Sequence, residues 1–302
     1  MKKLSLLFSA GFFAIIAFIV VSCEKNDLPQ ASVDLSATDI ALAHDDAVAD
    51  DIYNDVDADV LTEIQILDEN DFQSVSLKTT NEEFPCLTVT VDYPDTLRFP
   101  KVITLDYGDG CTFIINGDTI TKKGIIIVTL TDKFYVPGAQ RIVTFNEFYM
   151  NEVKVEGVLT STFNGVNDND LLEYTMTLED GKLIYDESSV YTREARHKKE
   201  WLRSEFPIED TLFISGSSWG INIEGEEYSR EIIDELVLAH CPSYGRRWVI
   251  VDGQVESTVG DETTLIDYSD GGCDGTAVIA RKGIRHRIRI RERHRHRFHI
   301  GN

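Results

Sequence analysis

The chain has 302 residues, of which 42% are hydrophobic and 27% charged, with only 7 prolines and 20 glycines. This length can bury one large hydrophobic core or two modest ones, and the composition excludes a chain that is disordered throughout, collagen-like or of low complexity. The 52 acidic residues outnumber the 29 basic ones, so the net charge is -23. Phosphates are repelled from such a surface, which excludes nucleic acid as a general partner.

The N-terminus has the pattern of an export signal. Lys2 and Lys3 precede an uncharged, mostly apolar run of 18 residues, 4–21. A charged start followed by an apolar run predicts a signal peptide over residues 1–22. An uncleaved membrane anchor is the alternative, because the run approaches the length of a spanning helix.

The residues around Cys23 indicate a lipid attachment site directly after the signal. Val20, Val21 and Ser22 precede Cys23, and this sequence resembles the lipobox of bacterial lipoproteins, in which the cysteine is acylated and becomes the first residue. The resemblance implies a stable membrane anchor at Cys23, because two lipid signals suffice for one. The segment 24–27 is similar to the acidic export tag of Bacteroidota lipoproteins. It implies an outer-membrane protein on the periplasmic or the cell-surface face.

An acidic segment comes next in the chain. Residues 24–77 contain 15 acidic residues and one basic residue. Within it, apolar residues recur at four-residue spacings or multiples of four, at Ile40, Val48, Ile52, Val56 and Val60. Aspartates fill the positions between them, at Asp45, Asp46, Asp50, Asp51, Asp55, Asp57 and Asp59. We therefore predict an acidic tether with an amphipathic helix over residues 23–80. Two interpretations remain: the apolar stripe docks on the following domain, or the segment is a solvated stalk.

The rest of the chain has the period of two that is typical of β-strands. Apolar and polar residues alternate in 87–93, 103–107 and 172–178, which predicts antiparallel strands with one dry face. Hairpin turns are expected at 116–118 and 180–181. We predict an all-β fold, an antiparallel meander that forms a sandwich or a curled sheet, preceded by the short acidic helix.

The apolar run 125–128 is continuous rather than alternating. It suggests one strand that is buried on both faces.

Two segments of the β domain resemble each other. Residues 104–111 and 265–273 share the pattern Asp-Tyr-Gly/Ser-Asp-Gly and end in cysteine. We predict an internal duplication of the β domain, 81–302, into two related sheet halves at about 84–165 and 166–302. Chance similarity of two turn segments is the alternative.

Four cysteines remain beside Cys23, and four cysteines allow three pairings. The repeat selects Cys86 with Cys111 and Cys241 with Cys273, since each pair closes one unit. An exported protein lives where disulfides persist. Metal binding is the competing interpretation of these cysteines, but the chain has no C-x-x-C spacing, so no metal site is predicted.

The first pairing also has a geometric argument. A hairpin turn centred between Arg98 and Phe99 places Leu87 opposite Gly110, and the two cysteines opposite each other.

Together, the lipobox, the acidic segment and the cysteine-bounded repeats resemble uncharacterised β-rich lipoproteins of the Bacteroidota. The resemblance extends over most of the chain in its general pattern, but it depends on short motifs. It implies a location and a non-catalytic role, and it supplies no site residues.

Candidate catalytic residues are few. Residues 216–220 match the G-x-S-x-G nucleophile elbow, with Ser218 as nucleophile, but the surrounding pattern predicts a β-hairpin rather than the strand-to-helix turn that the motif needs. Four aspartates recur in the repeat and could serve as acid–base pairs or cation ligands, namely Asp106, Asp109, Asp267 and Asp270. Aspartate and glycine at such positions are typical of structural turns.

The C-terminal segment is basic. Every odd position from 285 to 297 is arginine, at Arg285, Arg287, Arg289, Arg291, Arg293, Arg295 and Arg297. The alternation predicts a strand with guanidinium groups on one face. Three interpretations remain: an edge strand protected against aggregation, a partner for the acidic segment 34–71, or a binding site for an external anionic polymer. The arginines also oppose metal binding by His294, His296 and His299.

The sequence thus favours a lipid-anchored cell-envelope protein with a binding or structural role, without a cofactor or an identifiable catalytic site. The alternative is an envelope hydrolase that acts on glycans or esters.

Overall fold

The computed structural model describes residues 37–69, 72, 77–78, 86–92, 98–115, 118–242, 248–268 and 272–289. Contacts divide the chain into residues 1–33 and residues 34–302. Only the second unit contains described residues. The predicted signal peptide and Cys23 lie outside them.

The acidic segment forms one long helix, α1 (Ala37–Glu69), of 33 residues. At 1.5 Å per residue its length is about 50 Å. The helix contains no glycine or proline, so nothing in its interior breaks the backbone hydrogen bonds. The helix that the four-residue spacing predicted is therefore confirmed.

The described residues form one antiparallel sheet of fifteen strands, which is not closed. A short 3-10 helix, η1 (Pro207–Glu209), precedes β10. The strands are β1 (Leu77–Lys78), β2 (Thr88–Asp92), β3 (Lys101–Asp106), β4 (Cys111–Ile115), β5 (Asp118–Leu130), β6 (Gln140–Met150), β7 (Val153–Val166), β8 (Leu172–Ile184), β9 (Val190–Leu202), β10 (Thr211–Ile221), β11 (Glu227–His240), β12 (Trp248–Val259), β13 (Glu262–Asp267), β14 (Thr276–Arg281) and β15 (Ile284–Arg289).

The strands follow chain order across the sheet, except that β4 pairs only with β5. This is the predicted antiparallel meander. Of its two predicted forms, the structure has the curled sheet, because the strands that it describes form one continuous sheet rather than two facing layers.

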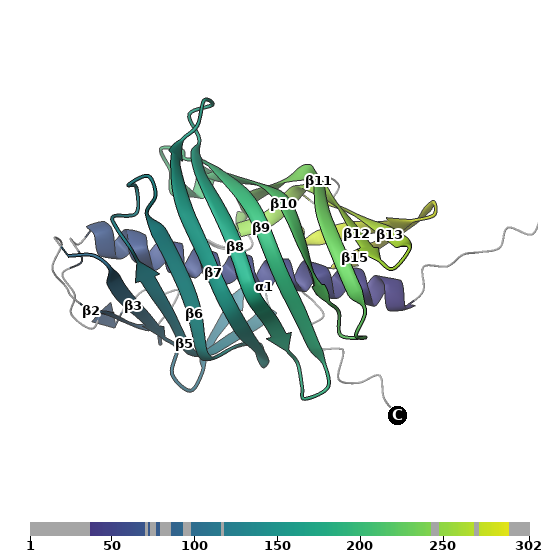
Figure 1. Ribbon diagram of the computed structural model, residues 1–302, viewed down its shortest axis with the longest axis horizontal. Coiled ribbons are helices and arrows are strands. Elements are labelled where there is room, and N and C mark those ends of the chain that lie inside the picture. The colour runs from purple at the N-terminus through teal and green to yellow at the C-terminus, as the bar shows by residue number, and fades with distance from the viewer. Residues whose placement is uncertain are drawn as a thin grey trace, which may run out of the picture. The chain divides into compact units, whose positions relative to one another are not determined.

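The sheet curls around α1, which runs across the strands along its inner face (Figure 1). Of the described helix side chains from residue 43 to 69, only Glu69 is exposed. The docked interpretation of the acidic segment is therefore correct for α1. The helix occupies the place that a second sheet would fill in a sandwich.

The core lies between the apolar stripe of α1 and the inner face of the sheet. Ile52, Val56 and Val60 are fully buried, in one cluster with Leu105 and Val128. A second cluster surrounds the N-terminal part of the helix. Full burial of one such side chain contributes about 1.5–3 kcal/mol, so the stripe accounts for the docking.

The burial of β5 differs from the prediction. Ile126 and Val128 are buried, whereas Ile125 and Ile127 are half-buried. The strand is therefore buried mainly on its inner face, because α1 covers that face alone.

The turn predicted at 180–181 is wrong. Asp180 has a φ of 52° and the register shifts between Leu178 and Gly181, so these residues form a β-bulge and β8 continues to Ile184. The predicted hairpin of β4 and β5 is confirmed, with Ile115 paired to Asp118.

Candidate functional site at the helix–sheet interface

Basic residues line the inner face of the sheet. Lys122 of β5, Arg141 of β6, Arg193 and Lys199 of β9 and Arg230 of β11 are all buried. Since inner positions alternate along a strand, these cations face α1. The aspartates that the amphipathic pattern places on a polar face are largely buried as well. The curled sheet encloses that face, so its carboxylates meet cations instead of water.

The first cluster joins two aspartates of α1 to two arginines. Asp46 accepts from Arg193 Nη1 at 3.1 Å and lies 2.6 Å from Arg230 Nε. Both guanidinium groups also contact Asp50. Tyr191 donates its hydroxyl to Asp46 Oδ1 at 3.0 Å.

The charges of this cluster balance. Burial alone would raise the pKa of Asp50, but Arg230 and Arg193 outweigh it and hold that pKa below its usual value. Burial lowers the pKa of nearby His197 to about 3, so this histidine is neutral at physiological pH. The cluster therefore contains two cations and two anions, joined by ion pairs.

The second cluster has a surplus of positive charge. Lys199 Nζ lies 2.9 Å from Asp57 Oδ2 and donates to Asn54 Oδ1 at 3.3 Å. Arg141 Nη2 contacts the other oxygen of Asp57 and donates to Ser161 Oγ at 3.3 Å. Burial opposes the ionised form, yet Arg141 and Lys199 lower the pKa of Asp57 to about 2. One ionised carboxylate thus faces two cations.

The third cluster has the opposite balance. Lys122 Nζ lies 2.8 Å from Asp55 and 2.5 Å from Asp59, which also accepts from the Tyr107 hydroxyl at 2.7 Å. Burial raises the pKa of Asp59 despite Lys122. Burial and the Asp59 charge raise the pKa of Glu63, one turn further along α1, to about 7. Glu63 therefore titrates near neutrality.

A small cavity of about 30 Å³ adjoins the second cluster. Its lining combines charged, aromatic and aliphatic side chains, namely Asn54, Asp57, Ala58, Leu61, Phe134, Arg141, Ser161, Tyr174, Lys199, Trp201, Leu212, Leu238 and Trp248. Arg141 Nε, Arg141 Nη1 and the Tyr174 hydroxyl are buried and have no hydrogen-bond partner among the described residues. The cavity is therefore lined by two side chains with unpaired donors, and the Arg141 guanidinium group also lies over the Phe134 ring, 5.5 Å from its centroid.

The G-x-S-x-G segment lies within strand β10. Ser218 is buried in that strand and pairs with Arg230 of β11 and Ala195 of β9. The two glycines allow close approach of β9: a Cβ at Gly216 would lie 2.2 Å from the Arg196 carbonyl oxygen, and one at Gly220 would lie 2.1 Å from that of Thr192. The motif is thus a feature of strand packing, without the elbow that a nucleophile needs.

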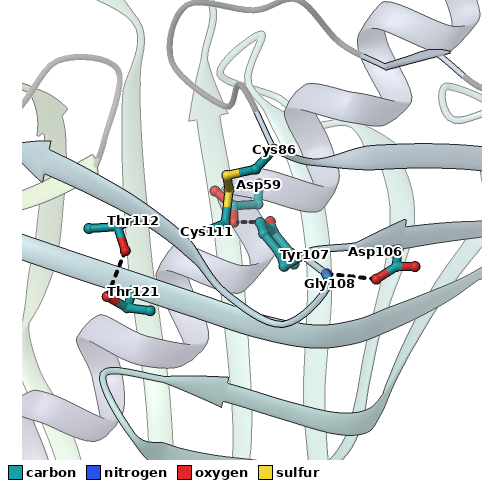
Figure 2. The surroundings of a disulfide bond; sticks show 8 residues. All are labelled: Asp59, Cys86, Asp106, Tyr107, Gly108, Cys111, Thr112 and Thr121. Carbon is teal, nitrogen blue, oxygen red and sulfur yellow. Dashed lines mark hydrogen bonds between the residues drawn. A yellow bond between two sulfur atoms is a disulfide. The ribbon is translucent and has the colours of Figure 1, made fainter.

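Both predicted disulfides are present. Cys86 and Cys111 have their Cα atoms 5.6 Å apart, and Cys241 and Cys273 5.5 Å apart. Figure 2 shows the first bond beside the hydrogen bond from Tyr107 to Asp59 of α1. This disulfide therefore lies next to the helix–sheet interface.

The predicted register of the first hairpin is wrong. Thr88 pairs with Asp106, so Leu87 does not lie opposite Gly110. A turn with positive φ at Gly108 and Gly110 brings the following strand back to Cys86.

The aspartates of the repeated motif have structural partners. Asp106 accepts from the Gly108 amide at 2.8 Å, and Asp267 pairs with Arg285 at 3.0 Å. Tyr107 and Tyr268, which follow them, are both buried. Asp109 is in an exposed turn, and Asp270 lies outside the described residues. The structure gives the described aspartates, Asp106, Asp109 and Asp267, no common site, and the duplication stays a prediction.

The described part of the basic C-terminus forms strand β15, as predicted. Arg285, Arg287 and Arg289 are exposed and Ile288 is buried. Arg287 lies 3.5 Å from Asp274. Arg291, Arg293, Arg295 and Arg297, together with the three C-terminal histidines, lie outside the described residues.

The sequence patterns above did not identify the basic residues of the interface as site residues, although the sequence of β9 contains an indication of them. Every second residue of β9 lies on the same face of the strand. That face carries both cations and residues typical of a core, namely Tyr191, Arg193, Ala195, His197 and Lys199. Charged residues at such positions indicate a buried, oppositely charged partner. The acidic helix could have been identified as that partner.

No protein-family model, curated protein or solved structure matches this chain. In the described ranges, no group of three or more histidine, cysteine, aspartate or glutamate side chains is arranged to hold a metal ion. Among the same residues, no helix is both long and apolar enough to cross a membrane.

Proposed function

We propose that the protein is a lipid-anchored component of the cell envelope, held on the outer membrane through Cys23, with a binding or structural role. The observation that carries the proposal is the lipobox-like sequence at the end of the apolar run 4–21. The two disulfides support it, because such bonds persist in exported proteins.

The position of α1 fits this role. Ala37 comes fourteen residues after Cys23, and a fully extended chain of that length would span about 50 Å at most. The helix that begins there is held along the sheet by buried ion pairs. A pull on the lipid anchor would therefore act on an element that is embedded in the core.

Mass spectrometry of the membrane-fractionated protein tests the proposal. The N-terminal peptide should begin at Cys23 and carry acyl chains, and the Cys23→Ser variant should leave the membrane fraction. An unmodified Cys23 with residues 1–22 still attached would contradict it. Protease treatment of intact cells then distinguishes the cell-surface face from the periplasmic face.

We also propose that the arginine-rich C-terminus binds an anionic polymer. The supporting observation is that Arg285, Arg287 and Arg289 are exposed on one strand while Ile288 is buried. Guanidinium groups bind carboxylates with paired hydrogen bonds.

Retention on an acidic polysaccharide resin should fall steeply with salt and disappear when all seven arginines from 285 to 297 become glutamine. The variant Arg196→Gln with Lys198→Gln, two exposed cations of β9, is the control and should be retained. Retention that survives the seven substitutions rejects this part of the proposal.

A further inference from the structure

We propose that the cavity beside Asp57 binds a small monovalent anion of the carboxylate type, held by Arg141, Lys199 and Tyr174. The inference concerns a site inside the β domain and does not depend on the lipid anchor.

Charge is the first argument. Arg141 and Lys199 bring two positive charges and Asp57 one negative charge, all buried. Buried charges are normally paired, because an unpaired one loses its hydration without compensation. Around Asp57 itself the two cations share one carboxylate, so a monovalent anion in the cavity would balance the second cation.

The unused donors are the second argument. Arg141 is 4% exposed and Tyr174 is 6% exposed. Two guanidinium nitrogens of Arg141 and the Tyr174 hydroxyl have no partner among the described residues, and both side chains line the cavity. Buried donors nearly always have an acceptor. A carboxylate has two acceptor oxygens and matches the planar fork of arginine.

The size of the cavity and its lining residues limit which ligands can bind. About 30 Å³ accommodates a group the size of formate. The cavity is partly open, and its lining residues Leu61, Leu212 and Trp248 are only partly buried. The anion is therefore either a free small carboxylate or the carboxylate of a larger molecule whose remainder lies in the opening.

Tryptophan fluorescence offers a direct measurement. Two of the three tryptophans of the chain, Trp201 and Trp248, line the cavity. The mature protein, dialysed against a zwitterionic buffer with sodium sulfate to hold the ionic strength, is titrated with sodium formate. We expect a saturable change in emission, and none in a matched sulfate titration, because a dianion exceeds the single charge of the second cation. The absence of saturation would overturn the proposal and leave the cavity as a water site only.

A second titration distinguishes the two sources of the carboxylate. Glucuronate that competes with formate would identify the carboxylate end of a larger molecule as the ligand. Failure of glucuronate to compete, with formate still bound, would identify a free small anion.

The variant Tyr174→Phe removes one donor and leaves the ion pairs of Asp57 intact. Its apparent affinity for formate should fall about tenfold or more, since hydrogen bonds to charged groups contribute about 1.5–3 kcal/mol. Tyr149→Phe, at a solvent-exposed hydrogen bond of β6, is the matched control and should bind as the parent does. Equal affinity in all three proteins would overturn the assignment.

A variant that is expected to bind formate more tightly tests whether weaker binding by Tyr174→Phe comes only from a general loss of structure. Asp57→Asn removes the negative charge that competes with the ligand, so formate should bind more tightly even though the free protein is less stable. Weaker binding by a folded Asp57→Asn protein would contradict the charge argument.

Discussion

The paired arginines show how single residues hold the helix in the sheet. Arg193 and Arg230 each contact both Asp46 and Asp50, and all four side chains are buried. Burying such charges has a large desolvation cost that only complete pairing offsets. The balanced cluster therefore specifies one position of α1 along the sheet more than it adds to net stability.

Removal of one charged side chain from this cluster should leave the desolvation cost of the others without compensation. Arg193→Leu leaves two buried carboxylates facing one guanidinium group, so the free energy of unfolding should fall by about 3–5 kcal/mol. Urea denaturation of the purified protein measures this change. Arg196→Leu, at an exposed position of the same strand, is the control and should stay close to the parent. A similar loss in both variants would mean that burial of the pair is not the cause.

The protonation of Glu63 should make the free energy of unfolding depend on pH. The dependence has the opposite sign to that of a salt-bridged acid. Its pKa is raised from 4.5 to about 7, so the folded state holds the proton more tightly than the unfolded state. Stability should therefore decrease as the pH rises from about 4.5 to 7, by at most about 1.4 kcal/mol per pH unit from this group.

The isosteric variant Glu63→Gln should remove this decrease and be more stable than the parent at pH 8. Denaturation curves at pH 5 and pH 8 measure the effect, with Glu69→Gln, the exposed acid at the end of α1, as control. A variant whose stability changes with pH as the parent's does would contradict a titrating Glu63.

At the scale of elements, β9 and β10 approach each other closely at two glycines. Gly216 has a φ of 121°, at a register shift between Ile214 and Ser217. A side chain there would meet the backbone of β9, which cannot move without disturbing Arg193 and Lys199 on the same strand. The bulge thus contributes to the placement of two interface cations.

The effect of substitutions in the G-x-S-x-G segment on stability should depend on how tightly each position is packed, and not on the Ser218 hydroxyl. Gly216→Ala combines an unfavourable φ with a backbone clash, so it should lower the unfolding free energy by about 1–3 kcal/mol or more. Ser218→Ala removes a buried hydroxyl without a hydrogen-bond partner among the described residues and should be neutral or stabilising. Thermal denaturation of both variants checks the order, which would be reversed if the Ser218 hydroxyl made an essential contact.

For the whole molecule, enclosure of α1 joins helix and sheet into one cooperative unit. The helix supplies part of both major hydrophobic clusters and the carboxylates for the cations of the sheet. Without α1, the inner face of the sheet would present apolar and cationic residues to solvent.

Hydrogen exchange measures this coupling. Backbone amides of residues 43–64 should exchange as slowly as those of the central strands β7 to β9, because both require global opening. Peptide-level mass spectrometry resolves the two regions. Fast exchange of α1 beside a protected sheet would show that the helix undocks independently.

Local patterns were sufficient for much of this architecture. The four-residue spacing from Ile40 to Val60 predicted the helix, the alternation of 103–107 predicted a strand, and the position of the cysteines in the repeat predicted both disulfides. These features depend on neighbours within one element, or on a repeat that can be compared directly. The turn expected at 180–181 shows the limit, because a bulge and a turn have the same local residues.

The partners of the acidic helix were decided only in three dimensions. Asp46 and Arg193 are 147 residues apart in the chain, and Asp57 and Lys199 are 142 apart. The alternation of β9 places its cations on one face, but that face meets α1 only because the sheet curls. The curl depends on the summed twist of many strands, which no short stretch of sequence contains. The interface, the local excess of positive charge around Asp57 and the cavity beside it are therefore properties of the tertiary structure.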